Sequence, residues 1–214
     1  NDETQKNMEK LKEEIERICP TIMQATPATW NALYKVGFQN KEKIKILCGG
    51  EALSEKLKKL FMDSNSEVWN MFGPTETTIW STMKKITKEA PVTIGKPIAN
   101  TQLYVLNQDG KPVPIGVPGE LYIGGDGLAK GYLYNEDITR ERFVQNPFDK
   151  NTRLYRTGDI VKWIDTGEIE YLGRADHQVK IRGYRIELNE IENRMNLYPD
   201  IQASVVIAGG EEGN

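Results

Sequence analysis

The alternation of helical and strand patterns in the first third of the chain is the strongest constraint on its fold. Apolar residues three and four apart, set among lysines and glutamates, predict an amphipathic helix over 8–18. Two further helices are expected after Thr26-Pro27 and after the capping residue Ser54. The strands expected between and after these helices cover 21–24, 43–48 and 66–69. This order predicts a parallel sheet with right-handed crossover connections.

Three loops follow the carboxyl ends of these strands, at 24–27, 49–51 and 72–76. In open parallel sheets, ligands bind beyond the carboxyl ends of the strands. We therefore expect the three loops to meet at one ligand-binding crevice.

The third loop lies in the stretch 70–76, which reads NMFGPTE. Its Gly-Pro pair ends a strand and exposes backbone. The aromatic ring of Phe72 can stack on a flat ring, and Glu76 can face Mg²⁺, a cation that takes oxygen ligands and accompanies phosphates. The stretch thus indicates a nucleotide site, with a tight turn ahead of an N-capped helix as the structural alternative.

The pattern changes after Thr77, where short strands separated by glycine turns replace the alternation. They predict a small antiparallel barrel or sheet beside the parallel one. The expected strands are 101–107, 119–125, 154–155, 160–164 and 168–172, with a short capped helix at 135–143.

A second domain is predicted to begin after a linker near Asp176. Its expected elements are strands at 178–181 and 185–188, a helix at 189–197 stopped by Pro199, and an apolar strand at 203–208. The fold class is therefore α/β: a parallel-sheet lobe over 1–88, an antiparallel barrel-like lobe over 89–175, and the start of a small α+β subdomain over 176–214.

Composition excludes several other classes of function. The net charge is -3 with both signs interspersed, which gives no reason to expect a nucleic-acid or membrane partner. The two cysteines have no metal-ligand spacing, and no apolar run approaches the length of a membrane span, so a reduced, cytoplasmic protein is expected. His177 is the one histidine available to a Ser-His or Cys-His mechanism, and no partner arrangement for it is visible.

Four strings in order carry a resemblance: NMFGPTE, then GELYIGGDGLAKGYL at 119–133, YRTGDI at 155–160, and GRADHQVKIRGYRIELNEIE at 173–192. From about Met8 to its end, the chain resembles the adenylation domains of nonribosomal peptide synthetases. These domains belong to the adenylate-forming superfamily with acyl-CoA synthetases and luciferase. The resemblance implies that a carboxylic acid attacks the α-phosphate of ATP, and that the acyl group then passes to the phosphopantetheine thiol of a carrier protein. Secondary-metabolite and antibiotic biosynthesis is the implied setting.

The resemblance also implies roles for individual residues. Glu76 corresponds to the Mg²⁺ ligand, Phe72 to the ring stacked on adenine, and Thr75 to an α-phosphate contact. Asp159 corresponds to the carboxylate that accepts both ribose hydroxyls. Thr75, Glu76 and Lys180 are the implied catalytic residues, and the remaining nucleotide contacts are Gly50, Glu51, Asn70, Gly73, Tyr171 and Arg174.

Asp176 corresponds to the hinge about which the small domain turns, and 180–184 to the loop that then faces the carrier arm. Simpler explanations are a surface ion pair between Arg174 and Asp176, and an Asp159 that caps the turn at Gly158.

An apolar acyl pocket follows from the same resemblance, because the residues at its wall positions are uncharged: Ala25, Leu47, Gly49, Met71 and Ile79. Such a wall predicts an uncharged, aliphatic or small substrate, since an unpaired buried charge is costly. The family's Asp for the substrate amino group would precede residue 1, so α-keto, α-hydroxy and aryl acids stay open.

The chain departs from the family pattern at Lys130, usually Arg, and at Asn189, often Gly. The phosphate loop and the C-terminal lysine of the family lie outside the sequence, so we expect little ATP–pyrophosphate exchange from these 214 residues alone. They would be a segment of a longer enzyme or a domain split by an insertion. A carboxylate–CoA ligase and a non-catalytic binding module remain as alternative functions.

Overall fold

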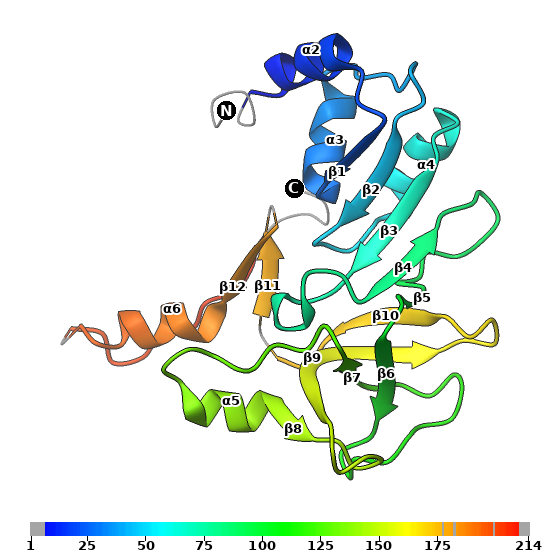
Figure 1. Cartoon of the computed structure of the whole chain (residues 1–214). Coiled ribbons are helices and arrows are strands. Elements are labelled where there is room, and N and C mark those ends of the chain that lie inside the picture. Colours follow the sequence, from blue (N-terminus) through cyan, green and yellow to red (C-terminus); the bar gives the residue numbers. More distant parts are fainter. Residues whose placement is uncertain (1–6, 177, 182, 199, 210–214) are drawn as a thin grey trace. The chain divides into compact units, whose positions relative to one another are not determined.

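Figure 1 shows the computed structural model of the chain, which describes residues 7–176, 178–181, 183–198 and 200–209. His177, Arg182 and Pro199, which figure in the sequence expectations, lie outside the described residues. The chain divides into two compact units, residues 1–68 with 176–214 and residues 69–175, and each is described by itself. The three-part division expected from the sequence stays a prediction.

Three helices of the first unit begin at side-chain caps, and two of these caps, Thr26 and Ser54, are suggested by the sequence. Asn7 Oδ1 accepts from the backbone N–H groups of Glu9 and Lys10, and Thr26 Oγ1 accepts from Thr29 N at 3.3 Å. Ser54 Oγ accepts from Leu57 N at 3.2 Å in the same way. Each cap satisfies backbone donors that have no partner within the helix. The three helices are α2 (Met8–Ile18), α3 (Pro27–Lys35) and α4 (Glu55–Asp63).

Two parallel strands form the centre of this unit, β1 (Ile22–Ala25) and β2 (Lys45–Gly49), with Ala25 opposite Cys48. The parallel pairing expected from the alternation is confirmed here. Trp30 of α3 and Phe61 of α4 are fully buried, and their rings meet edge to face at 6.0 Å. The helices are therefore held by apolar burial, the dominant favourable term in folding.

The C-terminal part of this unit contains an antiparallel hairpin and a helix: β11 (Gln178–Ile181), β12 (Tyr184–Glu187) and α6 (Leu188–Met195). The strand expected at 203–208 is wrong, because no strand lies in residues 200–209. Instead, Glu192 of α6 accepts from Val206 N at 2.8 Å and its carbonyl from Ser204 Oγ at 3.2 Å. Ser204 and Val206 are therefore hydrogen-bonded to α6 where the sequence predicted a strand.

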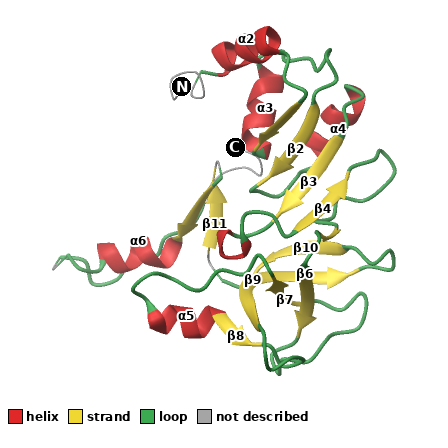
Figure 2. Cartoon of the chain, in the orientation of Figure 1, coloured by secondary structure: helices red, strands yellow, loops and turns green. Residues whose placement is uncertain are grey.

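The second unit consists of antiparallel strands, shown in yellow in Figure 2. β3 (Val68–Phe72) enters it at residue 69 and pairs with β4 (Thr82–Lys85), which pairs with β5 (Lys96–Pro97). The other sheet has the order β10-β9-β7-β6, and β8 pairs with β9. Its strands are β6 (Thr101–Leu106), β7 (Gly119–Gly125), β8 (Phe143–Gln145), β9 (Arg153–Trp163) and β10 (Ile169–Arg174). The short helix between β7 and β8 is α5 (Glu136–Arg142).

Two of the differences from the expected strand boundaries affect residues of the expected site. The strand predicted to end at residue 69 continues through Phe72, because Phe72 pairs with Thr82. The strands predicted at 154–155 and 160–164 form the single strand β9, which passes through Gly158 at φ +78. The Gly158-Asp159 pair therefore lies within the sheet, although its sequence is typical of a turn.

A partly buried carboxylate joins separate strands of the second unit. Glu168, directly before β10, accepts from Lys84 of β4 and from Thr93 Oγ1 at 2.9 Å. Burial opposes ionisation of this carboxyl, but the hydrogen bonds from Lys84 and Thr93 outweigh it and lower its pKa. A carboxyl whose pKa is lowered by folding stabilises the folded state above its unfolded pKa, and that stability is lost as the pH falls.

Changing Glu168 to Gln will therefore destabilise the full-length protein by about 2 kcal/mol at pH 7, as expected for losing charge-assisted hydrogen bonds. Urea unfolding measures the effect. The deficit should shrink as the pH falls below about 4.3, where the carboxyl of the unfolded chain takes up a proton first and that of the folded protein follows at lower pH. Glu89→Gln, at an exposed position, is the matched control. A deficit that stays equal from pH 7 to pH 3 would contradict the assignment.

Candidate active site

The site expected at 70–76 is built on a sharp turn after β3. A Cβ on Gly73 would lie 2.5 Å from Ile79 O and 2.7 Å from Ser81 N, closer than real Cβ contacts come. Only glycine therefore fits, and Ser81 N can donate to Phe72 O at 2.8 Å. A one-turn 3₁₀ helix, η1 (Thr75–Thr77), follows and has no side-chain cap. The structural alternative, a tight turn ahead of an N-capped helix, is therefore borne out only as far as the turn, which carries Thr75 and Glu76 on an uncapped 3₁₀ turn.

Glu76 is held by a segment far away in the sequence. Its side chain is 6% exposed, and its Oε1 accepts from the Tyr132 hydroxyl at 2.5 Å. Its backbone carbonyl accepts from Ala129 N at 2.9 Å. The sequence analysis missed Tyr132, although the residue lies within the glycine-bearing string 119–133 that supports the resemblance.

Tyr132 belongs to a small aromatic cluster with Phe143 and Tyr155. Its hydroxyl lies 3.3 Å from that of Tyr155, and its ring meets Phe143 edge to face at 5.6 Å. Burial raises the pKa of Tyr132 above its usual value, and the hydrogen bond to Glu76 raises it further. The phenol is therefore a neutral donor to the carboxylate.

The second carboxylate of the expected site forms a buried ion pair. Asp159 Oδ1 lies 2.9 Å from Arg174 NH1, and the two side chains are 6% and 10% exposed. Asp159 and Arg174 are register partners on β9 and β10. Thr157 also contributes: its Oγ1 accepts from Asp159 N at 2.9 Å, and its carbonyl accepts from Arg174 NH2 at 3.1 Å. Asp159 is thus no turn cap, and its pair with Arg174 is not a surface contact.

The residues expected around the adenine lie on β3, and Tyr171, expected near the ribose, lies on β10. The rings of Phe72 and Tyr171 lie 6.2 Å apart at 45°, and both pack on the apolar core of the second unit. Asn70 is 4% exposed, and its Nδ2 donates to Thr93 O at 2.8 Å. The structure thus brings the rings of Phe72 and Tyr171 together. The side-chain amide of Asn70 uses one N–H in a hydrogen bond to the backbone carbonyl of Thr93.

The first unit holds the other expected nucleotide residues. Gly50 has φ +93, a conformation that favours glycine, directly after β2. Glu51 bridges two backbone donors, Ala28 N at 3.2 Å and Gly183 N at 2.6 Å. Lys180 is exposed on β11, and Asp176 Oδ1 accepts from Gln178 N at 3.2 Å.

The expected acyl pocket draws on both units, so it stays a prediction. Ala25 and Gly49 are the last residues of β1 and β2, Leu47 lies in the middle of β2, and Met71 and Ile79 lie in the second unit. Ile79 is 60% exposed at φ +71. A β-branched residue in the left-handed region is a true outlier, and such strain clusters at functional sites.

Thiol chemistry gains no support from the two free cysteines, of which Cys19 is exposed and Cys48 buried. Burial, with a smaller contribution from the charge of Glu51, raises the pKa of Cys48 to about 12. This thiol is therefore protonated at neutral pH and a poor nucleophile.

A magnesium ion fits the donors present. Over the described residues, no three His, Cys, Asp or Glu side chains are grouped to hold a metal ion. Glu76 offers a carboxylate, which is the kind of oxygen ligand that Mg²⁺ takes in proteins.

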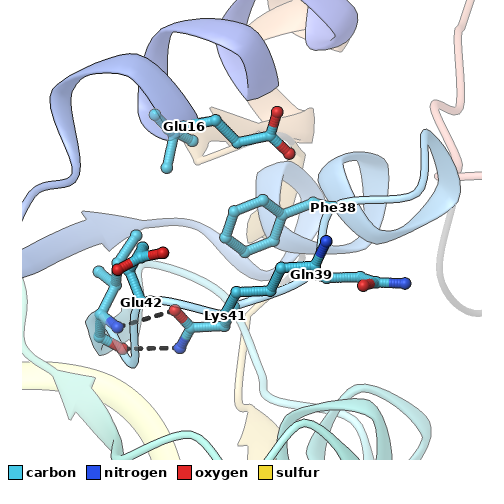
Figure 3. Close-up of a pocket in the computed structure, with 8 residues that line it drawn as sticks. Glu16, Phe38, Gln39, Lys41 and Glu42 are labelled. Atoms are coloured by element: carbon cyan, nitrogen blue, oxygen red, sulfur yellow. Dashed lines mark hydrogen bonds between the residues drawn. The ribbon is translucent and has the colours of Figure 1, made fainter.

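A cavity of about 260 Å³ lies elsewhere in the first unit (Figure 3). Its lining includes Phe38, Lys41 and Asn40, whose amide bonds to both backbone groups of Ile44 and to Ser66. The protein itself satisfies the polar groups of this amide, and none of the expected site residues lines the cavity.

The turn at Gly73 carries one buried carboxylate, and a pair of aromatic rings and a second buried carboxylate lie on strands of the same unit. The family model described as AMP-binding enzyme matches residues 1–133. The chain therefore belongs to the family of AMP-binding enzymes. Among the described residues, no helix has the length and apolar character needed to cross a membrane.

The relatives of the chain are nonribosomal peptide synthetases. It is 47% identical over 217 residues to a dimodular nonribosomal peptide synthase of Bacillus subtilis, covering 99% of this chain and 9% of that protein. It is 41% identical, with a TM-score of 0.78, to a four-domain nonribosomal peptide synthetase bound to AMP and glycine, covering 99% of this chain and 16% of that one.

The chain is also similar to PA1221, a protein containing adenylation and PCP domains. The identity is 29% and the TM-score 0.82, covering 96% of this chain and 43% of that one. The resemblance to peptide-synthetase adenylation domains is confirmed, and so is the α/β fold class. The chain spans less than half the length of each of these proteins, and the carboxylate–CoA ligase alternative is not favoured.

Proposed function

We propose that this chain is the nucleotide-binding part of an adenylation domain that activates an amino acid with ATP and loads it onto a carrier protein. The observation that carries the proposal is Glu76, a carboxylate that is 6% exposed and held in a fixed direction by the Tyr132 hydroxyl. A buried carboxylate beside a turn is a suitable oxygen ligand for a nucleotide-bound cation.

The other residues of the second unit would bind and orient ATP. Phe72 and Tyr171 offer aromatic faces for the adenine and ribose, and Asp159 offers carboxylate oxygens to the ribose hydroxyls. Thr75, one residue before Glu76, would donate to the α-phosphate. When bound, Mg²⁺ supplies charge neutralisation on the phosphate oxygens. The site would place the carboxylate of the acid beside the α-phosphate of ATP. Holding two reactants together in this way contributes much of the rate of a reaction between two bound molecules.

The substrate would be an amino acid with an uncharged, small or aliphatic side chain. The uncharged residues at the wall positions that the resemblance implies support this: Ala25, Leu47, Gly49, Met71 and Ile79. The glycine bound to the four-domain relative is an acid of this kind.

A peptidyl carrier protein (PCP) with its phosphopantetheine would accept the acyl group, because a relative contains adenylation and PCP domains. Asp176 would be the hinge between the two half-reactions. The boundary between the compact units falls between Ala175 and Asp176, which supports this assignment. Lys180 on β11 would then belong to the moving part.

The test is ATP–pyrophosphate exchange by the full-length protein with a panel of amino, keto, hydroxy and aryl acids. We expect one small apolar amino acid to drive exchange, and the same acid to be loaded onto a phosphopantetheinylated PCP in preference to free CoA. No exchange with any acid, together with no ATP binding, would favour a non-catalytic module. Transfer to CoA in preference to the PCP would favour a CoA ligase.

A further inference from the structure

The segment 127–132, between β7 and α5, is attached to the turn that carries Glu76 at three points. Thr78 Oγ1 donates to Gly127 O at 2.7 Å, Ala129 N donates to Glu76 O at 2.9 Å, and Tyr132 donates to Glu76 Oε1 at 2.5 Å. The first of these bonds holds the Thr78 side chain, and the second holds the backbone of the turn at Glu76. The third fixes the direction of the carboxylate itself.

Tyr132 is in turn held in place by its surroundings. Its N–H donates to Thr139 Oγ1 of α5 at 2.8 Å. The preceding Gly131 has φ +150, and a Cβ there would lie 2.4 Å from Thr139 Cγ2. The close approach that sets the tyrosine backbone therefore depends on glycine.

The hydroxyl hydrogens can be assigned from the chemistry of the groups. A carboxylate only accepts, so the one hydroxyl hydrogen of Tyr132 points to Glu76. In the 3.3 Å contact between the two phenols, Tyr155 is then the donor and Tyr132 the acceptor. The result is a directed chain from Tyr155 through Tyr132 to Glu76, in which each bond polarises the next.

We propose that Tyr132 is a positioning residue for Glu76: it sets the direction of this carboxylate for the nucleotide-bound cation, with Tyr155 setting the Tyr132 hydroxyl. The inference rests on the proposed function, in which Glu76 binds that cation. A carboxylate accepts several bonds at once, so the bond from Tyr132 is compatible with metal coordination. Hydrogen-bond partners of metal ligands fix ligand geometry, and their loss weakens metal affinity.

The chain offers a matched pair of substitutions two residues apart. Tyr132→Phe keeps the ring against Phe143 and removes the hydroxyl that contacts Glu76. Tyr134→Phe removes the same hydroxyl from a side chain that is 97% exposed. Tyr155→Phe, the third variant, keeps the bond between Tyr132 and Glu76 and removes the hydroxyl that contacts Tyr132.

The primary readout is Mn²⁺ binding to the full-length protein with α,β-methylene-ATP, followed by electron paramagnetic resonance of free Mn²⁺. We expect the Mn²⁺ dissociation constant to rise about 10-fold for Tyr132→Phe, at the lower end of the effect of such partners. It should rise less for Tyr155→Phe and not at all for Tyr134→Phe. The Mg²⁺ needed for half-maximal exchange should shift in the same order, with recovery at high Mg²⁺.

Each outcome decides the proposal. Unchanged Mn²⁺ affinity in Tyr132→Phe overturns it, even if exchange falls, because the tyrosine would then be structural only. If Tyr132→Phe unfolds, Tyr155→Phe decides by the same titration. The proposed function is tested separately, by exchange: it is refuted if the wild-type protein drives exchange with no acid. The Mn²⁺ titration tests the role of Tyr132 and requires no turnover.

Discussion

Replacing Glu76 by Gln will lower ATP–pyrophosphate exchange by the full-length protein by at least about 100-fold, the scale on which single electrostatic groups act in preorganised sites. The amide keeps the size of the side chain and an oxygen that can accept from Tyr132. It loses the negative charge that a cation between protein and phosphate requires. The reaction should therefore fail while the turn at Gly73 stays in place.

Exchange and thermal unfolding, measured together, separate chemistry from stability. We expect the unfolding temperature of Glu76→Gln to stay close to that of the wild type. Glu89→Gln, the same change on an exposed side chain, should leave both quantities unaltered. If Glu76→Gln retains more than about a third of wild-type exchange at limiting Mg²⁺, the carboxylate is not a ligand of the cation.

The elements that the sequence predicts well are those with local signals. Thr26-Pro27 and Ser54 begin α3 and α4 because a cap and the first turn of a helix are neighbours in sequence. The parallel pairing of β1 and β2 follows from alternation alone. The motif strings identify the family because their order and spacing extend over much of the chain.

The features that the sequence does not reveal depend on long-range contacts. Glu76 and Tyr132 are 56 residues apart, and the Lys84–Glu168 pair spans 84. The strand β4 reads TMKK, which has too little alternation to predict a strand, and it forms because β3 supplies a partner. The site residues that were missed, Tyr132 and Tyr155, carry no local signal because their role is defined by contact with Glu76 and with each other.

The Asp159 carboxylate would have two tasks. It pairs with Arg174, which stabilises the fold, and it is the proposed acceptor for the ribose hydroxyls. Both side chains are at most 10% exposed, so a neutral partner would leave the guanidinium buried without its counter-charge. Removing one member of a buried ion pair typically costs about 3 kcal/mol or more. The same carboxylate is the proposed acceptor for both ribose hydroxyls, a task that needs acceptor oxygens and no donor.

Asp159→Asn should therefore change two measurements at once. Urea unfolding should show a loss of about 3 kcal/mol, because Arg174 loses its charged partner. The preference of exchange for ATP over 2′,3′-dideoxy-ATP should fall by about 10-fold or more, because the amide can no longer accept from both hydroxyls. The dideoxy comparison isolates the ribose contact, since a general loss of activity affects both nucleotides equally.

Asp137→Asn is the control for this experiment, because Asp137 also pairs with an arginine, Arg140, but is 92% exposed. An exposed pair contributes little to stability, and this one lies outside the nucleotide site, so neither measurement should change. A stable Asp159→Asn protein that still discriminates between the two nucleotides would remove Asp159 from the ribose site. An unstable variant with intact discrimination would leave it only the structural task with Arg174.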